Sequence, residues 1–505
     1  MKKNSLIIIS FISLLLIFFF YVIVKNDDIF LFTLGLSLFM ILVSLFSHID
    51  VLKVMKKYSN REYYYTRDKI FKICLLIIVG IGLILALVTV LLSLLLENIM
   101  HIDNMLLVMT VMSINVIAIP LLRLLKSFLV IHNFKTLSKY IIHIYIVMID
   151  VYVLLVSYIS FVKLKLPSYI SITGLFMAPL TILCLLFIVV MILWYMKNKG
   201  FKKKYIIKRE EVKIDIKKDI KKIFNDNIRY SMIMIVTNFI PYISIILFYV
   251  CLVNHFGYPY DDTVRVINIT YLYGYVVIYF LVSCFWVLVR NKLNYIKKEI
   301  INKNYDVVSL HFANYFNNLL KILLPIVITL SVISGSIWML CYGDYNGATI
   351  LMLLFIMSLF LIIYLLLVQV IASFNNKKML GLVIGILLLV KIVFTIPMIG
   401  SFYRMGYELI YGDIVASMMA YLCASIVSII LINNKCHVNF SKCFDKTLTI
   451  IYENILLSLI LVLLQLVIST YVNNRLQALG VILVYMIIAV VFYLGKNWLN
   501  RYLKK

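Results

Sequence analysis

The residues of this chain most suited to chemistry are a few charged side chains inside long apolar runs. Arg123 and Lys126 share one run, His143 and Asp150 share the next, and Lys391 lies in a later one. Residues three or seven positions apart share one face of a helix, so the members of each pair would project in the same direction. The cations are suited to a phosphate-bearing ligand, and the carboxylate with the histidine is suited to binding a cation or exchanging a proton.

Asp150 and Lys391 lie deep within their apolar runs. At 1.5 Å per residue, each is roughly 20 Å from the nearer polar boundary of its helix on the basic side. A charge at that depth is costly in hydrocarbon and should face the protein interior or a watery cavity. Two interpretations stay open: Asp150 and Lys391 form a structural ion pair, or they line a cavity together with Arg123, Lys126 and His143.

The elements that must position these residues are membrane-spanning helices. The chain has 505 residues, of which 64% are hydrophobic and 14% charged, with a mean hydropathy of +1.05, and this balance excludes an ordinary water-soluble domain. A span needs about 20 apolar residues. Fourteen runs fit: 6–24, 30–47, 73–96, 105–131, 138–162, 170–196, 230–254, 264–289, 318–342, 348–373, 379–399, 411–432, 447–470 and 476–495. The predicted fold class is an all-α polytopic membrane protein.

The basic residues are distributed unequally between the two sides of this topology. Fourteen spans place 39 of the 48 Lys and Arg residues on the side of the termini and six on the other. The positive-inside rule then predicts that both termini are cytoplasmic. The formal charge of +26 is therefore mainly a signal of topology, and nucleic acid is not an expected partner.

Loop order indicates an internal repeat. A short turn at 132–137 is followed 243 residues later by a similar one at 375–380, and the same shift brings the basic loop 48–72 onto 290–321. We expect two parallel six-helix lobes, followed by two additional C-terminal helices. The predicted divisions are a lobe at 1–196, a linker at 197–229, a lobe at 230–434, and the last two helices with a basic tail at 435–505.

The linker between the lobes has the pattern of an amphipathic interfacial helix. Apolar residues recur at helical spacing among lysines, which is typical of a helix lying at a membrane surface. These residues are Val212, Ile216, Ile220, Ile223 and Phe224. Anionic lipids are the expected partner, and a solvated linker whose charge only fixes topology is the alternative.

Other chemistry is not indicated. The chain has no G-x-x-x-x-G-K-[ST] loop, so active transport of any kind would be secondary. Cys436, His437 and Cys443 lack the paired spacing of a zinc site. No metal or cofactor is predicted, no catalytic residue is assigned, and the protein is not expected to be an enzyme.

Prolines within spans are candidate hinges. Proline removes a backbone N–H and bends a helix. Asn238 precedes Pro241 and Thr395 precedes Pro397, and these polar side chains are placed to satisfy backbone groups that the prolines leave free. Pro241 and Pro397 are therefore the predicted hinges.

The pattern resembles the polysaccharide exporters of the multidrug/oligosaccharidyl-lipid/polysaccharide (MOP) superfamily, and within it the lipid II flippase and stage V sporulation protein B group. The resemblance rests on six plus six plus two spans, on the loop R-E-Y-Y-Y-T-R-D-K-I-F-K at 61–72, and on L-V-K-I-V-F-T-I-P-M-I at 389–399. The second motif matches the family's lysine at Lys391 and has Thr395 where the family often has asparagine. The residues at 125–130, L-K-S-F-L-V, depart from the family's R-G-Y-x-Q-G, and span one has no arginine.

The resemblance implies two lobes in a V, alternating access and a bacterial cytoplasmic membrane. It implies a flippase for an undecaprenyl-pyrophosphate-linked saccharide of the cell envelope, such as peptidoglycan lipid II or another polysaccharide unit. Arg123, Lys126 and Lys391 would then bind the pyrophosphate, and a sodium or proton gradient or the membrane potential would drive transport. A cation-coupled exporter of drugs or small molecules is the alternative, with Asp150 as the coupling carboxylate; a membrane glycosyltransferase is a third class. We expect a monomer.

Overall fold

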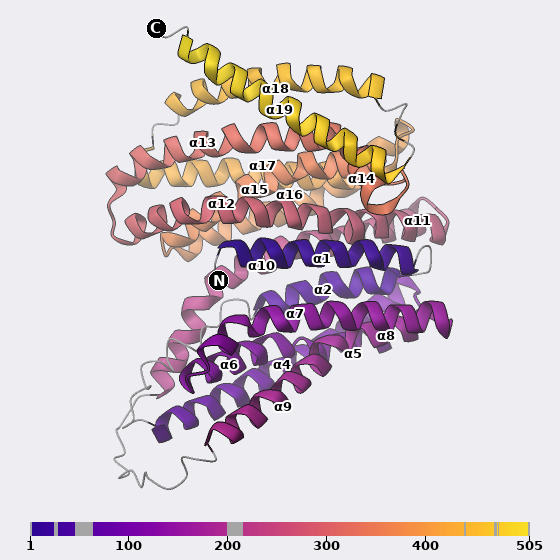
Figure 1. The fold of residues 1–505 in the computed structure, drawn as a ribbon, viewed down its shortest axis with the longest axis vertical. Coiled ribbons are helices and arrows are strands. Elements are labelled where there is room, and N and C mark those ends of the chain that lie inside the picture. The colour runs from indigo at the N-terminus through magenta and orange to yellow at the C-terminus, as the bar shows by residue number, and fades with distance from the viewer. Residues whose placement is uncertain are drawn as a thin grey trace. The chain divides into compact units, whose positions relative to one another are not determined.

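The computed structural model describes residues 3–24, 29–45, 64–198, 216–438, 441–468, 472 and 474–502. Within these ranges the regular structure is helical and contains no strand (Figure 1). Twelve helical runs in the described ranges are long and apolar enough to cross a membrane, and two shorter apolar helices, at Leu14–Val24 and Phe30–Leu45, precede them. The predicted all-α multi-pass membrane protein, with about fourteen spans, is confirmed.

The helices gather into two compact units. Unit 1 comprises Met1–Val22 and Ser244–Lys505, and unit 2 comprises Ile23–Ile243. The chain therefore passes from one unit to the other inside two helices, α1 (Lys3–Val24) and α10 (Ile216–Val250). The lobe boundaries expected from the sequence stay a prediction, and the linker's Val212 lies outside the described residues.

Unit 2 contains the first half of the remaining helices. They are α2 (Phe30–Leu45), α4 (Tyr64–Met100), α5 (Met105–Asn115), α6 (Ala118–Ile131), α7 (Lys135–Ser157) with the π-helical turn η2 (Tyr158–Lys163), α8 (Ser168–Phe176) and α9 (Ala178–Asn198). Part of its core lies where α6, α7 and α9 pack together, around buried Leu125, Ile141 and Ile182.

Unit 1 contains the second half and the C-terminal pair. Its elements are η3 (Cys251–His255), α11 (Tyr260–Ile267), η4 (Asn268–Gly274), α12 (Tyr275–Ile301), α13 (Tyr305–Val332), α14 (Ser334–Tyr342), α15 (Ala348–Ser373), α16 (Lys377–Arg404), α17 (Leu409–Cys436), α18 (Ser441–Ile468) and α19 (Arg475–Tyr502). Leu457 and Leu461 of α18 and Tyr485 of α19 pack with Ile333, between α13 and α14. This cluster anchors the last two helices to unit 1.

Helix bounds repeat along the chain at a nearly constant shift. The starts of α4 and α13, α5 and α15, α7 and α16, and α8 and α17 lie 241 to 243 residues apart. The two short turns noted in the sequence each contain an asparagine in the left-handed conformation, Asn133 at φ 62° and Asn375 at φ 60°. Asparagine tolerates that conformation better than most residues, which explains why both turns can be so tight.

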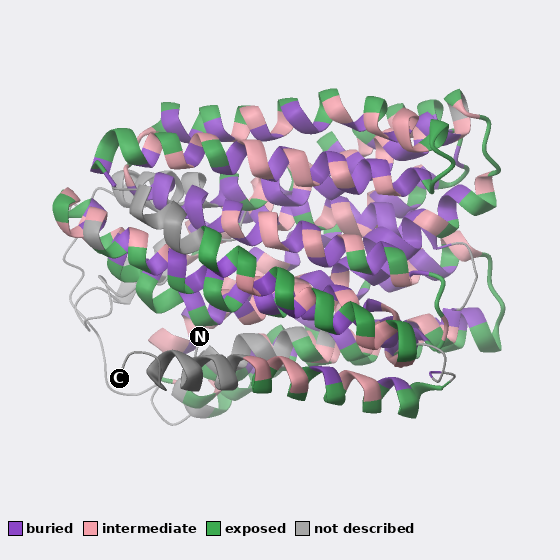
Figure 2. Ribbon diagram, turned by 90° about the horizontal axis from the view of Figure 1, so that it is seen from above, coloured by how far each residue is buried: buried purple, intermediate pink, exposed green. Residues whose placement is uncertain are grey.

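Most helices bury one face and leave the other exposed, as the alternation of colours along the ribbons in Figure 2 shows. On α4 the exposed face is apolar: Leu83, Leu87 and Leu91, four residues apart, are each more than half exposed. An exposed leucine stripe along a long helix is unfavourable in water and favourable against lipid chains. The same hydrophobicity that identified the spans therefore lies on their outer surfaces.

Candidate functional site

A buried ion pair joins α16 and α17 in unit 1. The Nζ atom of Lys391 lies 2.7 Å from Oδ1 of Asp413, and both side chains are 0% exposed. Lys391 also donates to the backbone oxygen of Asp413 at 3.1 Å and to Oγ of Ser417 at 2.8 Å. An ammonium group has three N–H donors, so every donor of Lys391 has a partner.

The second carboxylate oxygen of Asp413 is also satisfied. Tyr271, in the π-helical segment η4, donates its hydroxyl proton to Asp413 Oδ2. A π-helical turn inserts an extra residue and rotates the side chains that follow, which is one reason such turns recur at specialised sites. The result is a closed network of Lys391, Asp413, Ser417 and Tyr271, formed by three separate elements.

Small residues on α17 allow the two helices to approach closely. A Cβ atom on Gly412 would lie 2.7 Å from the backbone N and Cα of Ile399, so only glycine fits at this contact. Ala416 and Ala420, four and eight residues further along the same face, are also buried. Close backbone approach brings Asp413, next to Gly412, within reach of the lysine on α16.

The consequence for Lys391 is that its charge is neutralised inside unit 1. A substrate phosphate would have to displace Asp413 and Ser417 to reach it. The sequence left open an ion pair between Asp150 and Lys391, whereas the partner of Lys391 in the structure is Asp413. Buried ion pairs of this kind are expensive to break, because either partner left alone is an uncompensated charge.

Arg123 and Lys126 lie on α6 in unit 2. Both are partly exposed, and their spacing on a continuous helix places them on one face, as the sequence predicted. Lys126 is therefore accessible in a way that Lys391 is not. Arg123 also has an interaction partner within the structure.

His143 and Asp150 lie on α7 and are partly exposed. Oδ2 of Asp150 and Nδ1 of His143 are buried atoms that have no hydrogen-bond partner among the described residues. A buried polar atom without a partner is costly and often marks a place where an ion, a water molecule or a proton is accommodated. Two buried polar atoms on α7 are therefore available to bind an ion, a water molecule or a proton.

Pro241 and Pro397 both lie inside uninterrupted helices, α10 and α16. Asn238 donates from Nδ2 to the oxygen of Met40 at 3.2 Å and to Oγ of Ser44 at 2.8 Å, so it connects α10 with α2. Thr395 donates to the oxygen of Lys391 at 2.7 Å. Neither side chain bonds to the carbonyl that its proline leaves free, which is the one four residues before the proline. The hinge roles of Pro241 and Pro397 stay predictions.

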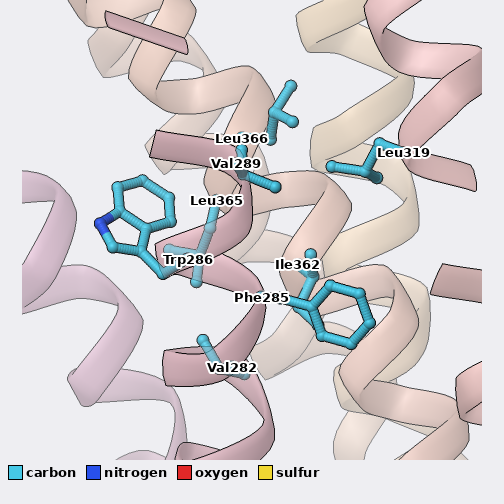
Figure 3. Close-up of a pocket in the computed structure, with 8 residues that line it drawn as sticks. All are labelled: Val282, Phe285, Trp286, Val289, Leu319, Ile362, Leu365 and Leu366. Carbon is cyan, nitrogen blue, oxygen red and sulfur yellow. The ribbon is translucent and has the colours of Figure 1, made fainter. Parts of the chain in front are cut away.

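One pocket within unit 1 lies between α12, α13 and α15 (Figure 3). Its eight lining residues, among them Phe285, Trp286 and Leu319, are all apolar, and its free volume is about 10 Å³. That is close to the space of one water molecule, and an apolar cavity of this size stays dry. It is a packing gap. No group of three or more His, Cys, Asp or Glu side chains suited to a metal occurs among the described residues.

Sequence reasoning missed Asp413, Ser417 and Tyr271. Asp413 lies at the edge of the predicted span 411–432, where a carboxylate is unremarkable, although α17 begins earlier, at Leu409. A usable signal was present: the carboxylate and hydroxyl of Asp413 and Ser417 are four residues apart, beside a glycine and alanines at the same spacing. Tyr271 gave no signal, because its approach depends on the π-helical turn.

Comparison with solved structures identifies the fold. The lipid II flippase MurJ in an inward closed conformation aligns at a TM-score of 0.64 and 14% identity, covering 99% of this chain and 100% of that one. An inward-facing multidrug resistance MATE transporter of the MOP superfamily aligns at 0.56 and 10% identity, covering 86% and 97%. The fold is that of the MOP superfamily transporters.

A MOP superfamily transporter from Pyrococcus furiosus aligns at a TM-score of 0.51 and 10% identity, covering 86% of this chain and 96% of that one. No protein-family model matches the chain, and no curated protein matches it in sequence. The resemblance read from the sequence is confirmed at the level of the MOP fold. The two solved structures aligned first are a flippase and a multidrug transporter.

Proposed function

We propose that this protein is a flippase that moves a polyprenyl-pyrophosphate-linked saccharide precursor of the cell envelope across a bacterial cytoplasmic membrane by alternating access. Both termini are cytoplasmic in this proposal, since the basic loops lie on their side. The undecaprenyl-linked glycan is the substrate, and a sodium or proton gradient is the energy source.

One observation carries the choice of substrate class. The MurJ alignment covers 99% of this chain, whereas the MATE and Pyrococcus furiosus alignments cover 86%. The difference corresponds in length to the segment after α17, which contains α18 and α19. A lipid-linked substrate needs a surface for its long apolar tail, and α18 and α19 expose large apolar side chains along much of their length. An exporter of free small molecules has no such need.

The anionic head group is assigned to unit 2. Lys126 is partly exposed on α6 and Arg123 shares its face, and two cations three residues apart suit the adjacent phosphates of a pyrophosphate. Lys391, predicted to bind substrate from the sequence, is enclosed by Asp413 and Ser417 in this conformation. We therefore propose a structural role for Lys391 and a substrate role for Arg123 and Lys126.

A second candidate, a cation-coupled exporter of drugs or small molecules, is favoured by one observation. Asp150 has a buried oxygen without a partner, and so does the His143 ring nitrogen on the same helix. A carboxylate in that state suits a cation or proton taken from the medium. In the flippase this pair supplies the coupling; in the exporter it would also bind the transported cation.

The test is leaflet accessibility of a labelled undecaprenyl-pyrophosphate sugar in proteoliposomes containing the purified protein. Protein-dependent movement to the opposite leaflet, faster with an imposed sodium or proton gradient, is the expected result. Vesicles containing Arg123→Gln/Lys126→Gln are the matched control and should move the lipid more slowly. Movement of organic cations, without movement of the lipid, would replace the flippase by the exporter.

A further inference from the structure

Two membrane spans of unit 2 are interrupted near their middle. The first breaks between Asn115, the last residue of α5, and Ala118, the first of α6; the second breaks at Met177, between α8 and α9. At the breaks the N–H of Ile117 donates to Ile114 at 3.4 Å and that of Met177 to Gly174 at 3.3 Å. These are contacts three residues back, in place of the four of an α-helix.

A proline follows each break within the first turn of the next helix. Pro120 is the third residue of α6 and Pro179 the second of α9. Proline has no N–H, and so neither can form the bond to the carbonyl four residues earlier that would continue the preceding helix. Each break therefore coincides with a proline that removes one of the backbone hydrogen bonds across it.

The side chain of Asn115 connects the two breaks. Its Oδ1 accepts the N–H of Leu180 at 3.0 Å, and its Nδ2 donates to the oxygen of Val111 at 2.7 Å. Leu180 is in the first turn of α9, where backbone N–H groups lack partners within their own helix. Asn115 thus caps α9 from a different span. It is 1% exposed, so water does not compete for these bonds.

A second side chain brings α7 to the same place. Tyr145 donates its hydroxyl to the oxygen of Pro179 at 2.9 Å and is 3% exposed. Tyr145 lies on α7 between His143 and Asp150. The helix on which Asp150 Oδ2 lacks a partner is therefore bonded to the break at the start of α9.

The corresponding helices of unit 1 lack this arrangement. α15 and α17, which start 243 and 241 residues after α5 and α8, are uninterrupted and contain no proline. The paired breaks are thus a property of unit 2 and not of the repeated fold.

We propose that Asn115 is a positioning residue that couples the two breaks into one joint, about which α6, α7 and α9 move together. α6 contributes Arg123 and Lys126, and α7 contributes His143 and Asp150, so the joint sets the cations and the carboxylate relative to one another. The consequence for transport rests on the proposed function. The joint itself is tested without substrate.

The experiment is hydrogen–deuterium exchange of the full-length protein in lipid nanodiscs, followed in peptides covering 116–119 and 177–181. Asn115→Leu removes both hydrogen bonds at similar volume. It should accelerate exchange about 10-fold in both peptides, because the buried hydrogen bond to Leu180 that connects the two breaks is lost. Tyr145→Phe removes a single contact and should accelerate exchange in both peptides by about 3-fold, and it keeps the test open if Asn115→Leu does not fold.

Asn454→Leu is the matched control. Asn454 is also 1% exposed and donates from Nδ2 to the carbonyl four residues back, Ile450, at 2.7 Å, but it lies inside the uninterrupted α18. It should lower the melting temperature about as much as Asn115→Leu and leave exchange at both breaks unchanged. If Asn115→Leu accelerates exchange only in 177–181, Asn115 is a local cap of α9 and does not couple the breaks. If exchange is unchanged in both peptides, the proposed joint does not exist.

The rate of transport distinguishes a positioning role of Asn115 from a merely structural one. In the leaflet assay, Asn115→Leu should slow the maximal rate about 10-fold and leave the substrate concentration for half-maximal rate unchanged, because the cations themselves are intact. Asn454→Leu should change neither, because the Asn454 side chain is buried and does not lie on the exposed apolar surface of α18. If Asn115→Leu accelerates exchange at both breaks but the wild-type protein moves no lipid-linked sugar, the proposed function is overturned and the joint is not. If Asn115→Leu transports at the wild-type rate, the joint has no role in transport.

Discussion

α16 of unit 1 and α7 of unit 2 are corresponding helices, and each contains a charge in the membrane, yet the two charges are treated in opposite ways. Lys391 has a partner for every donor and no exposed surface. Asp150 is partly exposed and has a buried oxygen without a partner. Corresponding helices of the two units can therefore differ in role. In unit 1 the charge on α16 is fully paired, and in unit 2 the charge on α7 has an oxygen available to bind a proton or a cation.

The helices around these charges differ in the same sense. α15, α16 and α17 run without interruption, and Gly412 lets two of them meet backbone to backbone. In unit 2 the spans next to α7 are broken at Asn115 and at Met177. The described helices around the ion pair of unit 1 are therefore continuous, whereas those beside α7 contain two breaks.

Breaking the ion pair should have the largest effect. Lys391→Met leaves the Asp413 carboxylate buried without its ammonium, and the loss in the free energy of unfolding should be about 3–5 kcal/mol. Thermal unfolding followed by tryptophan fluorescence measures it. The control is Lys391→Met/Asp413→Asn, which removes both charges and keeps an acceptor for Tyr271; it should recover most of the stability. A single variant as stable as wild type would show that the pair does not hold unit 1 together.

Neutralising Asp150 in unit 2 should affect transport and not stability. Asp150→Asn should leave the melting temperature unchanged or raise it, because a buried carboxylate oxygen without a partner is replaced by a neutral amide. Cation dependence of transport should weaken, with about 10- to 100-fold lower apparent affinity for the driving cation, the range expected when a charged contact is lost. A large loss of stability with unaltered cation dependence would place Asp150 with Lys391 as a structural charge.

Closing the space between α16 and α17 tests why unit 1 is so tightly packed. Gly412→Ala places a Cβ against the backbone of Ile399, which cannot move as a side chain would, and should cost about 1–3 kcal/mol. Gly385→Ala on α16 is the control: apart from the surrounding backbone of α16, no atom lies within 4 Å of its Cβ position, so the substitution should be neutral or slightly stabilising. Thermal melts of the two variants side by side distinguish close approach from a general effect of replacing glycine.

The smallest expected effect is at the accessible cation. Lys126→Gln should weaken binding of the pyrophosphate-linked lipid about 10-fold, as one charge-assisted contact is lost, with no change in stability. Lys139→Gln on α7, an exposed lysine outside the proposed site, is the control and should bind as wild type does. Equal affinity of the Lys126→Gln variant and wild type would remove Lys126 from the head-group site.

Much of the fold was predictable because hydropathy acts locally. Runs such as 348–373 coincide with α15, and the start predicted for the last span, 476, is one residue from that of α19, since length and apolar content alone decide whether a segment spans a membrane. The breaks at Asn115 and Met177 were not predicted. Pro120 and Pro179 lie within the predicted spans 105–131 and 170–196. A proline inside a span does not by itself predict a break, because it can also be accommodated in a continuous helix, as Pro241 and Pro397 are.

The site was less predictable because its geometry depends on packing between distant segments. The deep position of Lys391 was readable from the sequence, but the choice of Asp413 as its partner depends on the close approach at Gly412 and on the rotation of Tyr271 by η4. The spacing of Arg123 with Lys126 and of His143 with Asp150 was readable, since it follows from one helix each. That Asp150 keeps a buried oxygen without a partner was not, because it depends on which neighbours α7 meets.

The most direct test of the account measures the flipping rate of the labelled lipid-linked sugar in proteoliposomes for three proteins under the same imposed gradient. These are wild type, Lys391→Met/Asp413→Asn and Asp150→Asn. The contrast between the paired Lys391 and the open Asp150 predicts that the neutral pair in unit 1 flips within about 3-fold of wild type, while Asp150→Asn flips at least about 10-fold more slowly. Loss of flipping in the unit 1 variant, with wild-type flipping in Asp150→Asn, would contradict it.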